Sequence, residues 1–358
     1  MRIRAVLAAL PLVALAACGT TTSSPVNNSS GSAASAVSGS DGSAAPASAS
    51  PGPTLGPNVP PASTIAAPVP VGQLAAATGG FGIKPTLSFP SKNPPASLQR
   101  RILVQGKGAV AKKGDYLVTN YLGQVWGGKV FDNSYDKKST ATFAIGIGKV
   151  VPGWDTALVG THVGDRVELN LPPADGYGAS GNEQAGIKGT DTLVFIIDIV
   201  GVIAPGTAGQ ADAVPQKLPA DVPQVTGAPG QEPKIVIAPT LKEPTKNATY
   251  LVDKGNGAKV KDGTLLVQLV VTDYKQTQTQ STWPAAAGAS SSAAAGPSPS
   301  QASKGLQSIQ VSANSPIAGL IGLPLGSRAL VLIAPAKDPQ SGQAQPSAVA
   351  VVDLVAQG

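Results

Sequence analysis

Three segments of this 358-residue chain occur twice and in the same order. VQGKGAVAKKGDYLVTNYL returns as DKGNGAKVKDGTLLVQLVV at an offset of 149 residues, and LVGTHVGDRVELNLPP returns as LIGLPLGSRALVLIAP at 162. LVFIIDIV returns as AVAVVDLV at 155. Because the same apolar pattern is used twice, the repeat predicts two structured regions with related folds.

The segments around the repeats cannot bury a core. The chain contains 42 Gly and 33 Pro, many of them in runs with Ala, Ser and Thr that show no apolar periodicity. We therefore expect a disordered tether over 18–79, a Pro/Gly/Ala linker over 204–231 and a low-complexity insertion over 284–303. This leaves structured domains at 80–203, with a core at about 114–202, and at 232–358.

The N-terminus has the pattern of an export signal over residues 1–17. Arg2 and Arg4 precede a short apolar segment, which is too short to span a bilayer as a mature helix. It ends in LAAC, residues 15–18, which resembles the lipobox of bacterial lipoproteins. That resemblance implies that Cys18 carries acyl chains such as palmitate and anchors the protein on the extracytoplasmic face of the cell membrane. The alternative is an ordinary secretory signal with an incidental cysteine.

Charge and composition argue against several other functions. The net charge of +6 is spread along the chain without a basic run, so we expect no nucleic-acid binding. Cys18 is the only cysteine, which excludes an intramolecular disulfide. The sequence shows no nucleophilic triad, metal-ligand cluster or phosphate-binding loop, and His162 is interpreted as structural. No metal and no cofactor are expected.

The first domain has the pattern of an antiparallel sheet with one helix. Leu117, Thr119 and Tyr121 alternate with more polar neighbours, and Gly127-Gly128 indicates a hairpin turn. DRVELNLPP alternates in the same way, and DTLVFIIDIVGV fits a central strand. In VVPGWDTALVG, Trp154, Ala157 and Leu158 have helical spacing, and Gly160 suits the helix end. The expected class is α+β, an antiparallel sheet wrapped on one short helix and present twice.

The motifs of this region occur together in one known family. The segments KKGDYLVTNYLG, GKVFDNSYDKK, ATFAIGIGKVVPGWDTALVGTHVGDRVELNLPP, GYGASG and DTLVFIIDIVGV resemble an FKBP-type peptidyl-prolyl cis-trans isomerase domain, in unbroken order over about 98–202. The resemblance implies an enzyme, also called a rotamase, that rotates X-Pro bonds in an apolar aromatic pocket. Its partners would be Pro-containing polypeptides and macrolide inhibitors.

The resemblance also assigns roles to single residues. It makes Trp154 the floor of the prolyl pocket, with aromatic walls, an aliphatic rim, an acid beside the pocket and an overhanging loop around it. Val151 offers a backbone N–H to the ligand, and Tyr177 a hydroxyl. The complete set is Tyr121, Phe131, Asp132, Val150, Val151, Trp154, Tyr177, Ile187 and Phe195.

The sequence departs from the family pattern at several rim positions. Ala141 stands where many members carry an aromatic residue, and Lys137 where an arginine often pairs with the acid. The loop over 181–189 is about one residue longer than the commonest form. These departures affect substrate preference and macrolide affinity more than activity.

The second copy resembles the same family in degenerate form. At the repeat offsets Tyr121 becomes Val270, Trp154 becomes Pro316 and Phe195 becomes Ala350. The sheet-building residues persist while the pocket aromatics are lost together, so we expect a fold without a site.

Two functions follow from these observations. The first is a membrane-tethered, extracytoplasmic prolyl isomerase that assists the folding of exported proteins. The second is a non-catalytic Pro-peptide-binding or holdase module. Rotation of an amide breaks no bond, so a pocket without nucleophile, metal or general base is consistent with the first.

Overall fold

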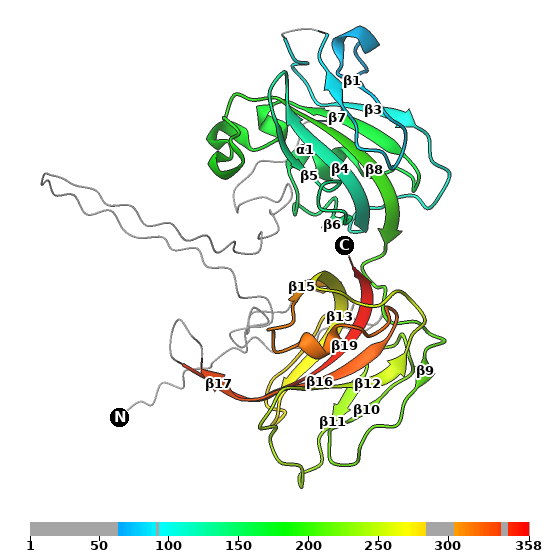
Figure 1. The fold of residues 1–358 in the computed structure, drawn as a ribbon, viewed down its shortest axis with the longest axis vertical. Coiled ribbons are helices and arrows are strands. Elements are labelled where there is room, and N and C mark those ends of the chain that lie inside the picture. Colours follow the sequence, from blue (N-terminus) through cyan, green and yellow to red (C-terminus); the bar gives the residue numbers. More distant parts are fainter. Residues whose placement is uncertain (1–63, 91–92, 284–303, 338–342, 358) are drawn as a thin grey trace, which may run out of the picture.

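The computed structural model describes residues 64–90, 93–283, 304–337 and 343–357. Most of its strands belong to two antiparallel sheets, one built mainly from each repeat, which Figure 1 shows one above the other. The expected signal peptide, Cys18 and the insertion 284–303 lie outside the described residues. None of the helices in the described ranges is long and apolar enough to cross a membrane.

The first sheet has six strands in the order β3-β7-β8-β4-β5, with β6 also paired to β4. The strands are β3 (Gln99–Val104), β4 (Tyr116–Val125), β5 (Val130–Asn133), β6 (Ala141–Ala144), β7 (Arg166–Leu171) and β8 (Leu193–Ile203). In β4, Leu117, Thr119 and Tyr121 are buried and the residues between them are half-buried, which confirms the predicted alternation. Gly127 turns the β4–β5 hairpin with a φ of +64°.

The single α-helix of the described residues, α1 (Pro152–Ala157), packs on one face of this sheet. Trp154, Ala157 and Leu158 are fully buried, as their spacing predicts. Gly160 follows the helix with a φ of +86°, a conformation that few other residues adopt. Three short 3₁₀ helices, η3 (Pro173–Asp175), η4 (Gly178–Ser180) and η5 (Glu183–Ala185), lie between β7 and β8.

The last residues of the expected tether are part of the first domain. This lead-in segment contains η2 (Val71–Gln73) and β1 (Ala76–Ala77), and β1 pairs with β2 (Leu87–Ser88). Leu74 is 4% exposed and Ala75 is completely buried. The expected domain boundary at residue 79 is therefore too late, because the chain is already packed at Leu74.

The lead-in segment also changes the environment of β7. The alternation in this strand predicts that Glu168 and Asn170 face water, yet both are 0% exposed. Arg101 bridges the two parts, because its Nε donates to Glu168 at 2.9 Å and its Nη2 donates to the carbonyl of Ala75 at 2.8 Å. The polar face of β7 is thus covered by residues that lie outside the repeat.

The second sheet has seven strands in the order β14-β13-β19-β16-β12-β9, with β15 also paired to β13. The strands are β9 (Val214–Pro215), β12 (Ala248–Lys254), β13 (Gly263–Asp273), β14 (Thr279–Ser281), β15 (Gln307–Val311), β16 (Arg328–Ile333) and β19 (Ala348–Gln357), and a separate hairpin joins β17 (Ala336–Lys337) to β18 (Ala344–Gln345). Strand for strand, β12 to β16 and β19 repeat the pairing of β3 to β8. In place of α1 there is one 3₁₀ turn, η6 (Ala318–Leu320).

Much of the expected linker 204–231 is packed against this second sheet. Besides β9, it contributes β10 (Gln224–Thr226), which pairs with β11 (Lys234–Val236). Val222 is 4% exposed and packs with Val252 and Val351 in a second apolar core on the outer face of the sheet. The Pro and Gly content predicted a linker, but this segment contributes to the β10–β11 hairpin, which covers the outer face of the second sheet.

The strand registers correct one predicted correspondence between the repeats. Tyr121 pairs with Ile197, whose counterpart 155 residues later is Val352, and Val352 pairs with Leu269. The residue that replaces Tyr121 is therefore Leu269, and the prediction of Val270 is wrong by one residue. The turn before β13 is one residue shorter than the turn before β4, so the offset falls from 149 to 148 there.

A buried ion pair fixes the lead-in segment to the first sheet. Arg166 and Asp198 are 1% and 0% exposed, and Arg166 Nε donates to the carboxylate at 2.7 Å. The guanidinium also donates to the carbonyls of Gly79 at 2.7 Å and Ile83 at 2.6 Å, and Asp198 accepts from the backbone nitrogen of Gly82. The pair therefore satisfies the backbone of a segment that has few hydrogen bonds of its own.

The second repeat contains an equivalent buried ion pair. Arg328 Nε donates to Asp353 at 2.7 Å, and the two side chains are 1% and 0% exposed. Arg328 also donates to the carbonyls of Ala228 and Gln231, and Asp353 accepts from the backbone nitrogen of Gly209 at 2.9 Å. In both repeats, an Arg–Asp pair thus holds the segment that precedes the sheet.

The connection between the two sheets is short. Five residues separate Ile203, the end of β8, from Gly209, which is hydrogen-bonded to Asp353. Tyr116 of the first sheet donates its hydroxyl to the carbonyl of Leu306 in the second repeat at 2.5 Å. The second repeat therefore begins almost where the first one ends.

Candidate active site

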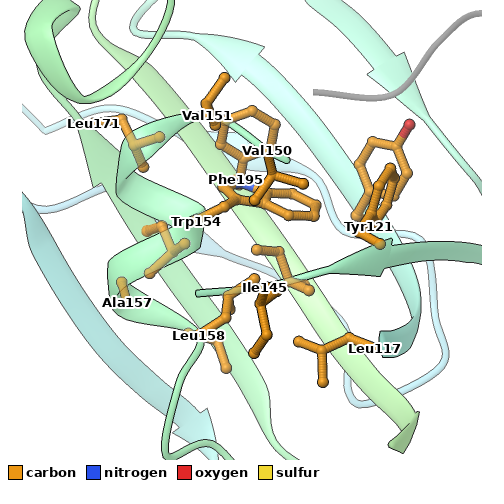
Figure 2. Packing of buried hydrophobic residues seen from close by; sticks show 14 of the residues in the cluster. Leu117, Tyr121, Ile145, Val150, Val151, Trp154, Ala157, Leu158, Leu171 and Phe195 are labelled. Atoms are coloured by element: carbon orange, nitrogen blue, oxygen red, sulfur yellow. The ribbon is translucent and has the colours of Figure 1, made fainter. Parts of the chain in front are cut away.

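Trp154 is the centre of an aromatic box between α1 and the first sheet. Its ring meets Tyr121, Phe143 and Phe195 edge to face, with centroid distances of 5.6, 5.2 and 5.1 Å and interplanar angles between 79° and 89°. This is the favoured geometry for aromatic pairs. Figure 2 shows Trp154 pointing from the helix towards Phe195 on the sheet. Four rings from four different elements therefore hold one another in position through these contacts.

The wall beside this box depends on a glycine. Phe131 on β5 meets Phe195 at 5.5 Å and 85°. A Cβ on Gly123 would lie 2.6 Å from the Phe131 ring and 2.7 Å from the Phe195 ring, so β4 accommodates only glycine there. In the second sheet the same register places Val271 opposite Ala350. Phe195 and Gly123 of the first sheet are thus replaced by two aliphatic residues in the second sheet.

Asp132 contacts both a residue of the aromatic box and a lysine at the surface. Its carboxylate accepts the hydroxyl hydrogen of Tyr121 on one oxygen and pairs with Lys137 Nζ at 3.0 Å on the other. Burial, the hydrogen bond to Asp132 and the charge of Asp132 all raise the pKa of Tyr121. Tyr121 therefore stays protonated and donates to the acid at any physiological pH.

Val150 and Val151 precede α1 and are 1% and 0% exposed. The carbonyl of Val151 accepts from the backbone nitrogens of Trp154 and Asp155, which begins the helix. The carboxylate of Asp155 reaches back to the nitrogens of Ile147 at 3.1 Å and Gly148 at 2.9 Å. The helix thus holds the loop that carries the two valines.

Tyr177 and Ile187 come from the segment between β7 and β8. Ile187 is 4% exposed, and its backbone exchanges two hydrogen bonds with Asn182. Tyr177 is half-buried against the same core. Burial raises the pKa of its hydroxyl, a hydrogen bond with Asn182 lowers it, and the nearby charge of Asp132 raises it. The Tyr177 and Asp132 side chains therefore lie on the same side of the box.

The structure brings the nine predicted pocket residues into one region of the first domain, and it adds Phe143. Phe143 was not among the predicted pocket residues, because the family pattern directs attention to Ala141 as the position without its aromatic ring. Phe143 is two residues further along β6, which puts its side chain on the same face of the strand and opposite Leu117. Strand periodicity could have identified it.

No cluster of three or more His, Cys, Asp or Glu side chains suited to a metal occurs within the described ranges. The box itself is nearly closed, since Trp154 and Phe195 are both 0% exposed. Phe131, Asp132 and Tyr177 at its edge are only half-buried. The chemistry available here is the binding of an apolar ring next to a few fixed hydrogen-bonding groups.

Comparison with known proteins identifies the family. The sequence model described as "FKBP-type peptidyl-prolyl cis-trans isomerase" matches residues 108–200. An "FK506-binding protein" of Streptomyces anulatus is 36% identical over 120 residues, which are 33% of this chain and 97% of that protein. The chain belongs to the FKBP-type peptidyl-prolyl cis-trans isomerase family. The FKBP domain of this chain is thus the first repeat, and it is an isomerase domain.

Other members of the FKBP family match the same part of the chain. "Peptidyl-prolyl cis-trans isomerase FKBP15-1" of Arabidopsis thaliana is 39% identical over 92 residues, 26% of this chain and 60% of that protein. Among solved structures, "Crystal structure of FkpA from Escherichia coli" is 34% identical, with a TM-score of 0.28, and the match covers 30% of this chain and 49% of that one. The family model and the Streptomyces anulatus relative confirm the expected FKBP family and isomerase class for the first domain.

Proposed function

We propose that the aromatic box is the prolyl pocket and that catalysis resides in the first domain alone. The observation that carries the proposal is the set of three edge contacts on Trp154, next to the Tyr121–Asp132 hydrogen bond. A flat ring with apolar walls accepts a pyrrolidine, and the polar groups stand where the substrate's carbonyls leave the pocket.

The physical task of the pocket is to lower the barrier to amide rotation. That barrier is about 18–20 kcal/mol, because rotation breaks the resonance of the peptide bond. The planar amide is the more charge-separated form, so transfer into an apolar box destabilises it relative to the twisted form. A rate gain of about 10⁴–10⁵ requires only ~5.5–7 kcal/mol of such differential stabilisation.

The rim residues have separate roles in this proposal. The Tyr177 hydroxyl and the backbone N–H of Val151 bind substrate carbonyls on either side of the proline. Ile187 packs over the bound segment from the loop that Asn182 holds. Asp132 keeps the Tyr121 ring in position and places a negative charge beside the twisting bond.

Asp132→Asn tests this assignment. It weakens a charge-assisted hydrogen bond worth about 1.5–3 kcal/mol, so we expect kcat/KM to fall by roughly one to two orders of magnitude. A protease-coupled assay on a proline tetrapeptide measures the rate, with and without rapamycin. The matched control is Asp136→Asn, because Asp136 pairs with Lys84 at the exposed surface. Equal rates in both folded variants would contradict the proposal.

We further propose that the protein is a lipoprotein tethered to the extracytoplasmic face of the cell membrane, where it assists the folding of exported proteins. The support is the LAAC motif at residues 15–18 and the low-complexity sequence that follows it.

Cys18→Ser should move the protein out of the membrane fraction or leave it unprocessed, because Cys18 is the only thiol that could carry the acyl chains. Detergent-phase partitioning of the two forms measures the change. The Thr20→Ser variant, two residues further along the chain, is the control and should partition like the wild type. If Cys18→Ser still enters the detergent phase, the anchor is not a lipid on this residue.

We propose that the second repeat is a degenerate FKBP domain that binds polypeptide without isomerising it. Its strands pair as in the first repeat, but Leu269 and Ala350 stand at the positions of Tyr121 and Phe195, and the regular β13–β14 register has no counterpart of the bulged residue Phe131. This observation favours a non-catalytic binding module for this half of the chain. An isolated 204–358 fragment should therefore show no isomerase activity above background.

A further inference from the structure

Asp253 of the second repeat is a buried carboxylate, and within the described ranges nothing donates a hydrogen bond to its side chain. It lies at a bulge in β12, between β16 and β9. Its side chain is 7% exposed, and its one ion pair is with Arg328 Nε at 3.9 Å, beyond hydrogen-bond distance. Buried carboxylates are normally hydrogen-bonded, so this one lacks the usual compensation.

The charges around Asp253 do not balance. Arg328 directs its guanidinium to Asp353 at 2.7 and 3.0 Å and to two backbone carbonyls. One arginine therefore faces two carboxylates, and one negative charge remains. Burial raises the pKa of Asp253, Arg328 lowers it and Asp353 raises it. With Asp253 ionised, the two carboxylates exceed the single arginine by one negative charge, which an additional cation beside Asp253 would offset.

The first repeat acts as an internal comparison. The position opposite Arg166 that corresponds to Asp253 is occupied by Val104, which is 39% exposed. Arg166 and Asp198 nevertheless hold their lead-in segment in the same way. Asp253 is therefore not needed to hold the second lead-in segment, and its presence calls for another role.

Asp253 lines a hollow of about 380 Å³ beneath the β10–β11 hairpin. Leu218, Val225 and Pro229 give the hollow apolar walls. Gln224 also lines it and uses its amide nitrogen on the carbonyls of Pro219 and Val222, which leaves its oxygen as an acceptor. The volume falls in the range of small-ligand pockets, about 300–1,000 Å³. The hollow thus has apolar sides and acceptors, with a carboxylate among its lining.

We propose that this hollow binds the guanidinium group of an arginine side chain presented by a polypeptide. A guanidinium has a planar set of five donors that suits a carboxylate and nearby carbonyl-type acceptors, and its stem packs on apolar walls. A metal ion fits less well, because no group of three ligand side chains occurs in the part of the chain that the structure describes. The site gives the second repeat a ligand of its own, independent of the prolyl pocket.

The test uses the full-length protein and two small probes. N-acetyl-arginine methylamide carries the guanidinium, and N-acetyl-citrulline methylamide has nearly the same shape without the charge. Amide NMR shifts of Thr226, Gly227 and Ala228, which line the hollow, report binding. We expect saturable shifts with the arginine probe at a Kd of about 1–10 mM, which is reasonable for one side chain. The citrulline probe should bind at least about tenfold more weakly.

Two variants separate the site from general effects. Asp253→Asn should abolish the arginine-dependent shifts, and it should fold because it removes a buried charge at almost constant shape. Asp262→Asn, at an exposed position of the same repeat, should bind like the wild type. Prolyl isomerisation should be the same in all three proteins. The proposal is overturned if no shift saturates, if citrulline binds equally well, or if folded Asp253→Asn retains binding.

Discussion

Arg328→Met should destabilise the second repeat by about 3–5 kcal/mol, the usual cost of removing one partner of a buried ion pair. The substitution leaves the Asp353 carboxylate buried without its counter-charge and removes the donors to Ala228 and Gln231. Hydrogen exchange at β16 and β19 measures the loss locally. Isomerase activity should be unchanged, because the proposed prolyl pocket is in the other domain.

Arg166→Met is the matched variant in the first repeat. It should destabilise its own sheet by a similar amount, because Arg166 makes the same contacts with Asp198, Gly79 and Ile83. Here activity should fall together with hydrogen-exchange protection. If Arg328→Met lowered activity as much as Arg166→Met, the two repeats would be folding as one unit and the assignment of catalysis to the first would lose its support.

Trp154→Leu should lower kcat/KM on the order of 100-fold, because three edge contacts of about 0.5–1.5 kcal/mol each position the floor of the pocket. The substitution also removes buried volume, so it should cost somewhat less than the ~3–5 kcal/mol typical of a change from Trp to Ala. The coupled proline-peptide assay measures the first effect and a urea titration measures the second.

Trp126→Leu is the control for this variant. Trp126 packs on Phe89 at 5.0 Å, outside the aromatic box, so its loss should reduce stability with little change in kcat/KM. Circular dichroism verifies that both variants are folded before rates are compared. A folded Trp154→Leu protein with wild-type kcat/KM would show that the box is a structural core and not the reaction site.

Local patterns predicted the central elements of the fold because burial there has a simple period. β4 alternates, α1 has helical spacing, and the turn at Gly127 requires a positive φ. The nine residues that we propose for the pocket were assigned through family resemblance, and the structure brings them together in one region of the first domain. The same periodicity, applied to β6, would have led to Phe143 as well.

The lead-in segments could not be predicted in this way. Their strands are two or three residues long, too short to show a period, and their Pro and Gly content suggests disorder. They are ordered because two distant buried arginines, Arg166 and Arg328, bind their carbonyls. The shift from Val270 to Leu269 arises from a one-residue change in a turn, which only strand pairing reveals.

The five-residue connection from Ile203 to Gly209 has a consequence for avidity. Even fully extended, it spans about 20 Å, so an unfolded client that binds in the prolyl pocket stays within reach of the second repeat. For such a client the second contact becomes intramolecular, with an effective concentration in the millimolar range. Two contacts that are each weak can then combine to raise the overall affinity by about 10²–10⁴. Clients with an arginine at a suitable distance from a proline would be retained longest and so would undergo more isomerisation events per encounter.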